Sequence, residues 1–463
     1  MGSTEQGRRR IDAAERRARL AVRHRLAGTA KARTVEEVAA SLVALHATDP
    51  ATVFLAVGAR LRDESNERDG TEGAGGEVGG RGAPSDPAPG SPDRAERPEE
   101  TRGPEEARGT EETRGPEETR GAQEARDPGE TGPVARLERA LYEDRSLTRM
   151  HGMRHTIFVF PTSLVPAVHA STTRDVAVRE RASLLAHLAA GSSYDADWLA
   201  ETERLVLAEL AERGEATGAE LGTAVPRLRV QYVYGVGTRG EGPQPLSSRL
   251  LRVLGMEGRI ARGRPQGAWT SSRFRWSLAP DLPDPSDADA HAALVREWLA
   301  AYGPATEADL KWWTGWRVTD VRKALAAVGA QTVELAEGTG YVLPDDTGPV
   351  AAPEPWAALL PALDPTAMGW QHRDWFLDPA HRPALFDRSG NIGPTVWWDG
   401  RIVGGWAQQP DGEVAWRLLD DVGEEARTAV AAEAARLAAW VGPVRVTPRF
   451  RTPLERELAA PGP

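Results

Sequence analysis

Apolar residues follow a helical spacing in several parts of the chain, and each part is followed by short runs typical of strands. Within 35–45, apolar side chains recur every three or four residues, as on one face of a helix. Asp49 and Pro50 then mark the start of a second helix, because Asp is favoured as N-cap and Pro at the first helical position. The segment 46–48 is therefore expected in a loop between two helices.

This order of helices followed by a strand pair occurs three times. The first set has helices within 35–61 and 137–142 and strands within 147–160, which turn near 151–152. The second has helices within 198–255 and strands at 260–264 and 274–278. The third has helices within 290–328 and strands at 332–335 and 341–343. Helices followed by a hairpin are typical of winged helices. We therefore predict an α+β protein with three tandem winged-helix domains.

After about residue 350, tryptophans and strand-like runs replace the helical spacing. Asp399 and Gly400 separate two such runs and are a typical type I′ hairpin turn. A helix at 424–441 and a strand at 444–447 should follow, which predicts a compact β-rich, barrel-like C-terminal domain. The expected domains are winged helix 1 (1–62 and 134–190), a disordered acidic insertion (63–133), winged helix 2 (191–285), winged helix 3 (286–349) and the C-terminal domain (350–463).

The charge of the chain is concentrated in the expected insertion. The 463 residues carry a net charge of −11, and residues 63–133, with 20 Asp or Glu and 9 Arg, account for all of it. This segment lacks aromatics and is poor in aliphatic residues, so it cannot bury enough surface to offset the entropy of ordering. Because the rest of the chain is neutral overall, contact with DNA requires a local arginine-rich face.

Composition excludes several kinds of site. The chain contains no cysteine, so disulfides, thiolate nucleophiles and cysteine-based zinc sites are ruled out, and its nine histidines show no metal-ligand spacing. No apolar run is long enough for a membrane span, and the basic N-terminus leads into no apolar segment of the secretory type. We expect a cytoplasmic, nucleoid-associated monomer without metal or other cofactor.

Five stretches of the chain resemble the bacterial winged-helix DNA glycosylases of the azinomycin-resistance type, which unhook crosslinks and remove alkylpurines. The matching stretches are 43–50, 153–159, 303–315, 360–370 and 390–401. This resemblance implies double-stranded DNA, alkylated or crosslinked, as the partner. It also implies hydrolysis of the N-glycosidic bond of bulky N7-alkylguanine or crosslinked adducts.

The resemblance also indicates the site. Relatives have Gln-x-Gln or Gln-x-Asp where this chain has His46, Ala47 and Thr48, and those side chains position the hydrolytic water. His46 with a pKa near the working pH would act as general base, giving a rate that depends on pH around that pKa, and Thr48 would orient the water. His46 as a partly buried structural residue is the competing interpretation, and Asp49 is expected to be only an N-cap.

Residues of the first hairpin are the expected DNA contacts. Arg149, Arg154 and His155 are placed there for contact with DNA, although a solvated strand face explains the two arginines nearly as well. The tryptophans at 312, 313 and 316 are expected in the core. Two other functions remain open: a non-catalytic DNA-binding protein, either regulator or lesion sequesterer, and a protein that sequesters a small-molecule drug.

Overall fold

The computed structural model describes residues 8–62 and 132–460. The described residues belong to one compact unit, and the expected insertion at 63–133 lies almost entirely outside them. The described chain is a mixed α/β structure. None of its helices is both long and apolar enough to cross a membrane.

The first helix-and-hairpin set follows an N-terminal helix, α1 (Ala13–Arg23), that the sequence patterns did not predict. Its elements are α2 (Val35–Ser41), β1 (Leu45–His46), α3 (Pro50–Gly58), α6 (Pro133–Tyr142), β2 (Leu147–His151) and β3 (Ile157–Pro161). The helix predicted over 35–45 ends early, because Val43 adopts a left-handed φ of 63° and the chain then turns into β1. Residues 46–48 therefore begin in a strand and not in a loop.

The same strand order appears in three sheets. β1 lies between α2 and α3 and pairs antiparallel with the second hairpin strand, which gives the order β1-β3-β2. The second set is α9 (Ala196–Arg213), β4 (Glu215–Thr217), α10 (Gly218–Ala224), α11 (Leu246–Met256), β7 (Ile260–Pro265) and β8 (Phe274–Leu278), with the order β4-β8-β7. The third is α12 (Asp287–Tyr302), β9 (Ala305–Thr306), α13 (Glu307–Thr314), α14 (Val318–Ala327), β10 (Gln331–Leu335) and β11 (Gly338–Val342), with the order β9-β11-β10.

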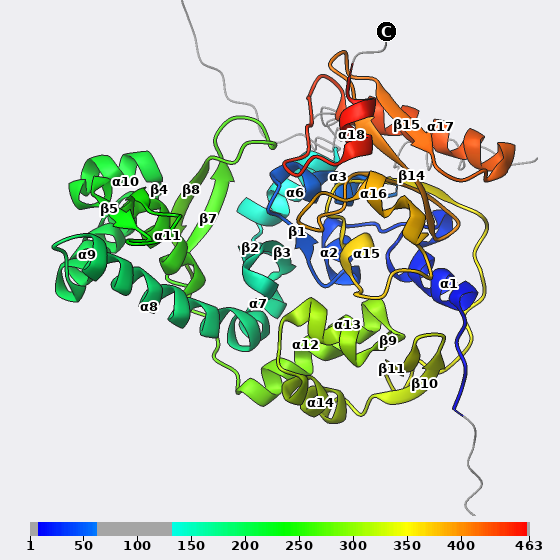
Figure 1. Cartoon of the computed structure of the whole chain (residues 1–463), viewed down its shortest axis with the longest axis horizontal. Helices are drawn as coiled ribbons and strands as arrows, with labels where there is room; N and C mark the ends of the chain where they lie inside the picture. The colour runs from blue at the N-terminus through cyan, green and yellow to red at the C-terminus, as the bar shows by residue number, and fades with distance from the viewer. Residues whose placement is uncertain (1–7, 63–131, 461–463) are drawn as a thin grey trace, which may run out of the picture. The chain divides into compact units, whose positions relative to one another are not determined.

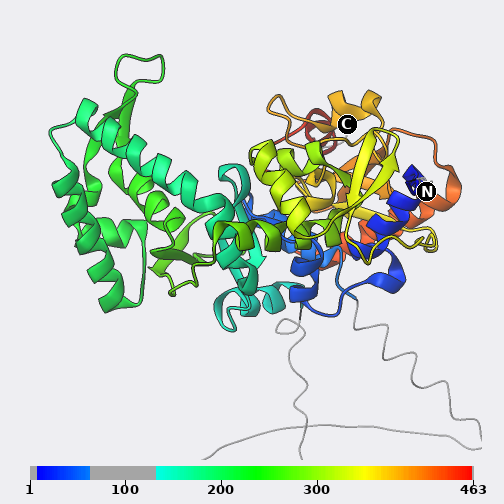
Figure 2. The same ribbon diagram turned by 90° about the horizontal axis from the view of Figure 1, so that it is seen from below.

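The second set has a hydrophobic core of its own. Helix α8 (Arg174–Gly191) and the hairpin β5 (Gln231–Tyr234) and β6 (Gly242–Pro245), none of them predicted, complete it. Both ribbon views show these elements gathered together in green (Figures 1 and 2). The first and third sets instead share their cores with the C-terminal part of the chain.

The C-terminal part is an open sheet, which corrects the barrel-like arrangement expected for 350–463. Its strands β12 (Ala357–Leu360), β13 (Thr395–Trp398), β14 (Arg401–Gln408) and β15 (Val414–Leu418) pair in chain order. Within the described residues β12 and β15 do not pair, and α17 (Gly423–Val441) packs against both while α18 (Pro453–Leu458) covers β14. The turn at Asp399 and Gly400 has the two positive φ angles of type I′, as predicted, whereas 444–447 is not a strand.

Candidate functional site

His46 lies on β1, an edge strand of the first sheet, opposite Phe158 of the central strand β3. Its side chain is only 6% exposed, and its ring meets that of Phe158 edge-on with centroids 5.0 Å apart. The buried Nδ1 has no hydrogen-bond partner in the protein. Because burying an unpaired polar atom is costly, this nitrogen is a candidate for holding a water or a substrate atom.

Thr48, two residues further on, also has a buried hydroxyl without a partner in the protein. The second and third sets differ here. There the helix follows the strand directly, and the last strand residue, Thr217 or Thr306, is an N-cap whose Oγ1 accepts from the backbone N–H of the third helical residue. In the first set residues 47–49 separate β1 from α3 and Asp49 is the N-cap, so Thr48 has no capping role.

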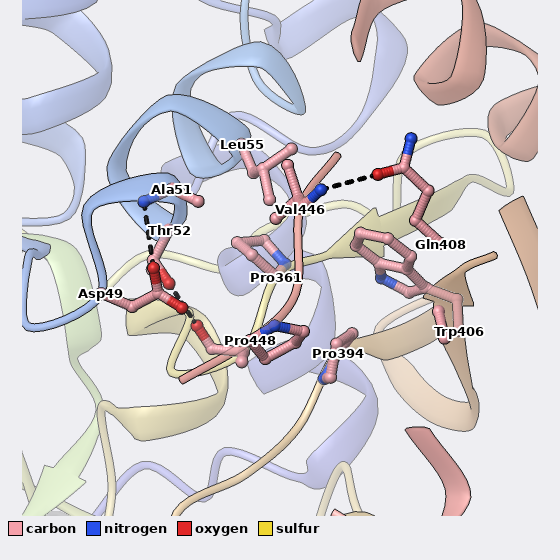
Figure 3. Close-up of a pocket in the computed structure, with 12 residues that line it drawn as sticks. Asp49, Ala51, Thr52, Leu55, Pro361, Pro394, Trp406, Gln408, Val446 and Pro448 are labelled. Carbon is pink, nitrogen blue, oxygen red and sulfur yellow. Dashed lines mark hydrogen bonds between the residues drawn. The ribbon is translucent and has the colours of Figure 1, made fainter. Parts of the chain in front are cut away.

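Asp49 is the N-cap of α3, as expected from the sequence. Its Oδ1 accepts from the backbone N–H of Ala51 at 3.1 Å, and its Oδ2 accepts from that of Arg449 at 3.0 Å. Figure 3 shows Asp49 and Ala51 beside a cavity of about 10 Å³, whose far wall includes Trp406 and Gln408. That space is the size of one water molecule. Each carboxylate oxygen of Asp49 accepts a backbone hydrogen bond, in keeping with a structural role.

Two arginines stack on one tryptophan next to His46. The guanidinium carbon of Arg154 lies 4.1 Å from the ring centroid of Trp312, and that of Arg373 lies 4.8 Å from it. Neither arginine forms an ion pair with a carboxylate among the described residues. We call Arg154, Trp312 and Arg373 the Arg-Trp-Arg cluster.

Backbone geometry directs Arg154 toward this cluster. Arg154 and His155 both have positive φ angles, 51° and 62°, in the turn between β2 and β3. Helix α13 ends at Gly315 with a φ of 78°, and a Cβ there would lie 3.4 Å from Cγ of Arg154. Unusual backbone in two facing turns thus brings the Arg154 side chain onto α13.

The electrostatics keep His46 neutral. Burial, followed by the positive charge of Arg154, lowers the pKa of His46 to about 3. The pKa of Arg373 is lowered to about 10 by burial and then by Arg382 and Arg154. His46 is therefore an uncharged hydrogen-bonding group across the physiological range, so a rate change centred on an ordinary histidine pKa is no longer expected.

The other two predicted DNA contacts lie away from His46. Arg149 is 4% exposed, and the pairing places it on the opposite face of the sheet, since His46, Phe158 and Met150 share one face. His155 is exposed, with Nδ1 3.9 Å from a carboxylate oxygen of Glu180. Of the three, the structure places Arg154 with His46; Arg149 does not lie on a solvated strand face.

Two members of the Arg-Trp-Arg cluster were not predicted as site residues. Trp313 and Trp316 are core residues as expected, but Trp312 is only partly buried and carries both arginines. Arg373 is distant in sequence from every other site residue, so no local pattern pointed to it. Within the described residues, no group of three or more His, Asp and Glu side chains could hold a metal ion.

Comparisons with known proteins agree on one family. The family model described as "DNA glycosylase AlkZ-like" matches residues 131–440, more than half of the chain, in a range that begins after His46 and Thr48. An interstrand DNA cross-link repair glycosylase from Streptomyces sahachiroi is 31% identical over 177 residues, which is 36% of this chain and 47% of that protein. The chain thus spans about half the length of this curated relative.

A protein of known structure has a fold similar to that of this chain. The DNA glycosylase AlkZ from Streptomyces sahachiroi superposes with a TM-score of 0.59 and 20% identity, over 94% of this chain and 98% of that one.

Proposed function

Because the chain belongs to the AlkZ-like DNA glycosylase family, we propose that it is a DNA-repair glycosylase that acts on double-stranded DNA. We infer that its substrates are bulky N7-alkylguanines or crosslinked adducts, in line with the relative from Streptomyces sahachiroi, an interstrand DNA cross-link repair glycosylase. The observation that carries the site is a pair of polar atoms, Nδ1 of His46 and Oγ1 of Thr48, which are buried close in sequence without partners in the protein.

The proposed reaction requires these two residues mainly as hydrogen-bonding groups. N7-alkylation gives guanine a positive charge and makes it a good leaving group, so departure of the base needs little acid catalysis. In this proposal the neutral imidazole of His46 accepts a hydrogen bond from the attacking water, and the hydroxyl of Thr48 orients that water beneath C1′. As the C1′–N bond breaks, the base leaves with the bonding electrons and the sugar becomes oxocarbenium-like. The water then bonds to C1′ and its proton passes to solvent.

The Arg-Trp-Arg cluster has a different proposed task. Two uncompensated guanidinium groups would repel a cationic base, but they suit the phosphates that flank it. We assign Arg154 and Arg373 to phosphodiester contacts that position the lesion over His46. Arg149 and His155 are not needed for this assignment.

The repeated strand order supports the architecture expected from sequence. We infer that the three helix-and-hairpin sets are winged helices within 1–62 plus 134–190, 191–285 and 286–349, because each places a short strand and three helices around one hairpin. In this proposal the protein binds DNA at the nucleoid as a monomer.

The direct test measures base release. Purified protein is incubated with an N7-alkylated duplex, and abasic sites are counted after alkaline strand cleavage under single-turnover conditions. We expect His46→Ala to lower the rate about 100-fold, an effect typical of a positioned group in an active site, and His46→Asn to retain more activity because its amide reaches the position of Nδ1. His187→Ala, which changes a partly buried histidine on α8, is the control.

A non-catalytic lesion-binding protein is the second candidate. It is favoured by the low pKa of His46, which makes the imidazole a weak base. Stoichiometric binding to alkylated duplex with no abasic sites, unchanged in His46→Ala, would support this candidate and contradict the enzyme.

A further inference from the structure

A cavity of about 820 Å³ lies between β2 and the β7–β8 hairpin. Much of its wall is apolar, formed by Leu141, Leu147, Ile157, Ile260, Trp276, Leu278 and Leu282. Its volume is in the range of pockets that enclose small organic ligands. Arginines and histidines interrupt this wall, so the cavity combines an apolar surface with positive charge.

Arg149 is the most unusual residue of this wall. It is 4% exposed, and none of its three guanidinium nitrogens has a hydrogen-bond partner in the protein. Its guanidinium carbon lies 4.9 Å from the ring centroid of Phe274. The hydroxyl of Tyr142, at the same wall, is also buried without a partner. A buried guanidinium with all its donors unpaired is costly unless a ligand supplies the acceptors.

A second cation lies beside the first. Arg262 stacks on Phe274 at 5.4 Å and on Trp276 at 5.2 Å, and it forms no ion pair among the described residues. Burial and then the charges of Arg149 and Arg252 lower the pKa of Arg262 to about 10. The two cations thus repel each other with no carboxylate between them.

Two other arginines of the wall are neutralised. Arg264 pairs with Glu138 and Glu143, and Arg275 pairs with Glu215. A fifth arginine of the wall, Arg145, is exposed to solvent. Among the described residues, Arg149 and Arg262 are therefore the arginines of the wall that are both unpaired and not exposed. Two adjacent guanidinium groups next to an aromatic surface match a phosphate group, with one or two negative charges, that is linked to a flat ring.

We propose that this cavity binds a nucleotide: its phosphate would contact Arg149 and Arg262 and its base would lie against Trp276. The bound nucleotide is either a free monophosphate or a nucleotide of a DNA strand. The site is separate from His46, because Arg149 projects from the opposite face of the first sheet. The inference therefore stands whether or not the proposed glycosylase activity is found.

Calorimetric titration of the full-length protein tests the proposal, with dGMP and deoxyguanosine as probes. We expect dGMP to bind at least about tenfold more tightly than deoxyguanosine, because the phosphate contributes charge-assisted hydrogen bonds. Arg262→Gln and Arg149→Met should each weaken dGMP binding about tenfold or more, whereas Arg264→Gln, whose arginine is already paired, should change it less than about threefold. Equal affinity for the two probes, or no heat with dGMP at millimolar concentration, would overturn the proposal.

Two further measurements complete the test. Competition with a single-stranded oligonucleotide distinguishes the two possible ligands. Displacement of dGMP by the oligonucleotide assigns the site to a DNA strand, and no displacement assigns it to a free nucleotide. Circular dichroism checks the fold of each variant. If the Arg149→Met variant does not fold, the test rests on Arg262→Gln, because Arg262 is only half-buried. Unchanged dGMP affinity in a folded Arg262→Gln variant would refute the site.

Discussion

Arg60 and Asp364 form a bidentate ion pair that is completely buried, across 304 positions of sequence. Nη1 of Arg60 donates to Oδ2 of Asp364 at 2.9 Å and Nη2 donates to Oδ1 at 2.7 Å. The other donors of Arg60 reach the backbone oxygens of His24 and Ala56 and the hydroxyl of Thr366. All five guanidinium N–H groups are thus satisfied, and the pair ties the end of α3 to the start of α15 (Pro365–Met368).

This pair should be expensive to break. Asp364→Asn leaves the buried charge of Arg60 without a counter-ion, and we expect a loss of about 3–5 kcal/mol in the free energy of unfolding. The double variant Arg60→Met/Asp364→Leu should recover much of that loss. Urea denaturation followed by circular dichroism measures both. Arg317→Gln, which breaks an exposed pair with Asp320, is the control and should cost under about 1 kcal/mol.

Thr48, Thr217 and Thr306, each at or next to a helix N-cap, should respond differently to the same substitution. Thr217→Ala and Thr306→Ala each remove an N-cap, so each should lower the free energy of unfolding by about 1 kcal/mol with little effect on base release. Thr48→Ala removes no cap and should lower the rate of base release while stability stays nearly constant. A Thr48→Ala variant that loses stability but not rate would refute the role proposed for this hydroxyl.

The rate of base release should be flat between about pH 5 and pH 8. The pKa of His46 is about 3, so its protonation state does not change in that range. A histidine of ordinary pKa, near 6.5, would instead lose about tenfold in rate for each pH unit below it. Single-turnover rates on alkylated duplex give the profile, and a steep fall below pH 6.5 that vanishes in His46→Asn would contradict a neutral hydrogen-bonding role.

Folding stability, in contrast, should fall in acid. The pKa values of His46 and His151 are both lowered to about 3, chiefly by burial, so between pH 6.5 and 3 the unfolded chain binds protons that the folded chain does not. The contribution of these histidines to the free energy of unfolding is therefore fully present above their pKa in the unfolded chain. It decreases as the pH falls toward their pKa in the folded chain. We expect a loss of about 2 kcal/mol per histidine at pH 5 relative to pH 7.5. Urea unfolding at both values measures it, and His151→Asn should reduce the difference.

The Arg-Trp-Arg cluster should be visible in the salt dependence of DNA binding. Arg373→Gln removes one proposed phosphate contact, so affinity should fall and the slope of log K against log salt should decrease by about one. Fluorescence anisotropy of a labelled duplex at several salt concentrations gives the slope. Arg322→Gln, whose arginine is exposed and paired with Glu307, should leave it unchanged.

Local patterns predicted most of the secondary structure. The three hairpins, the turn at Asp399 and Gly400, and α17 are confirmed, because alternation, turn residues and helical spacing are encoded within short segments. Helix α1 was missed although it is amphipathic, and α8 was missed because its apolar residues define no clear face. The barrel-like closure was wrong because pairing between edge strands depends on tertiary structure.

The candidate site was only partly accessible from sequence. His46 and Thr48 were found through the resemblance, and the N-cap at Asp49 through local chemistry. Arg373 and the Arg60–Asp364 pair join segments hundreds of residues apart, which no spacing rule can indicate. The low pKa of His46 likewise depends on burial and on the side chain of Arg154, neither of which is fixed by local sequence.

The connection between strand and helix in the first set has a broader consequence. In the second and third sets a threonine at the strand end caps the helix that follows, whereas in the first set residues 47–49 intervene and an aspartate is the cap. The longer connection thus creates a polar position, Thr48, that is free of the capping role, although its buried hydroxyl is left without a partner in the protein. The same change can be made elsewhere: an Asp inserted after Thr217 should become the new N-cap and release the Thr217 hydroxyl from capping. A threonine in one chosen copy of a repeated unit can in this way be made available for a new chemical role.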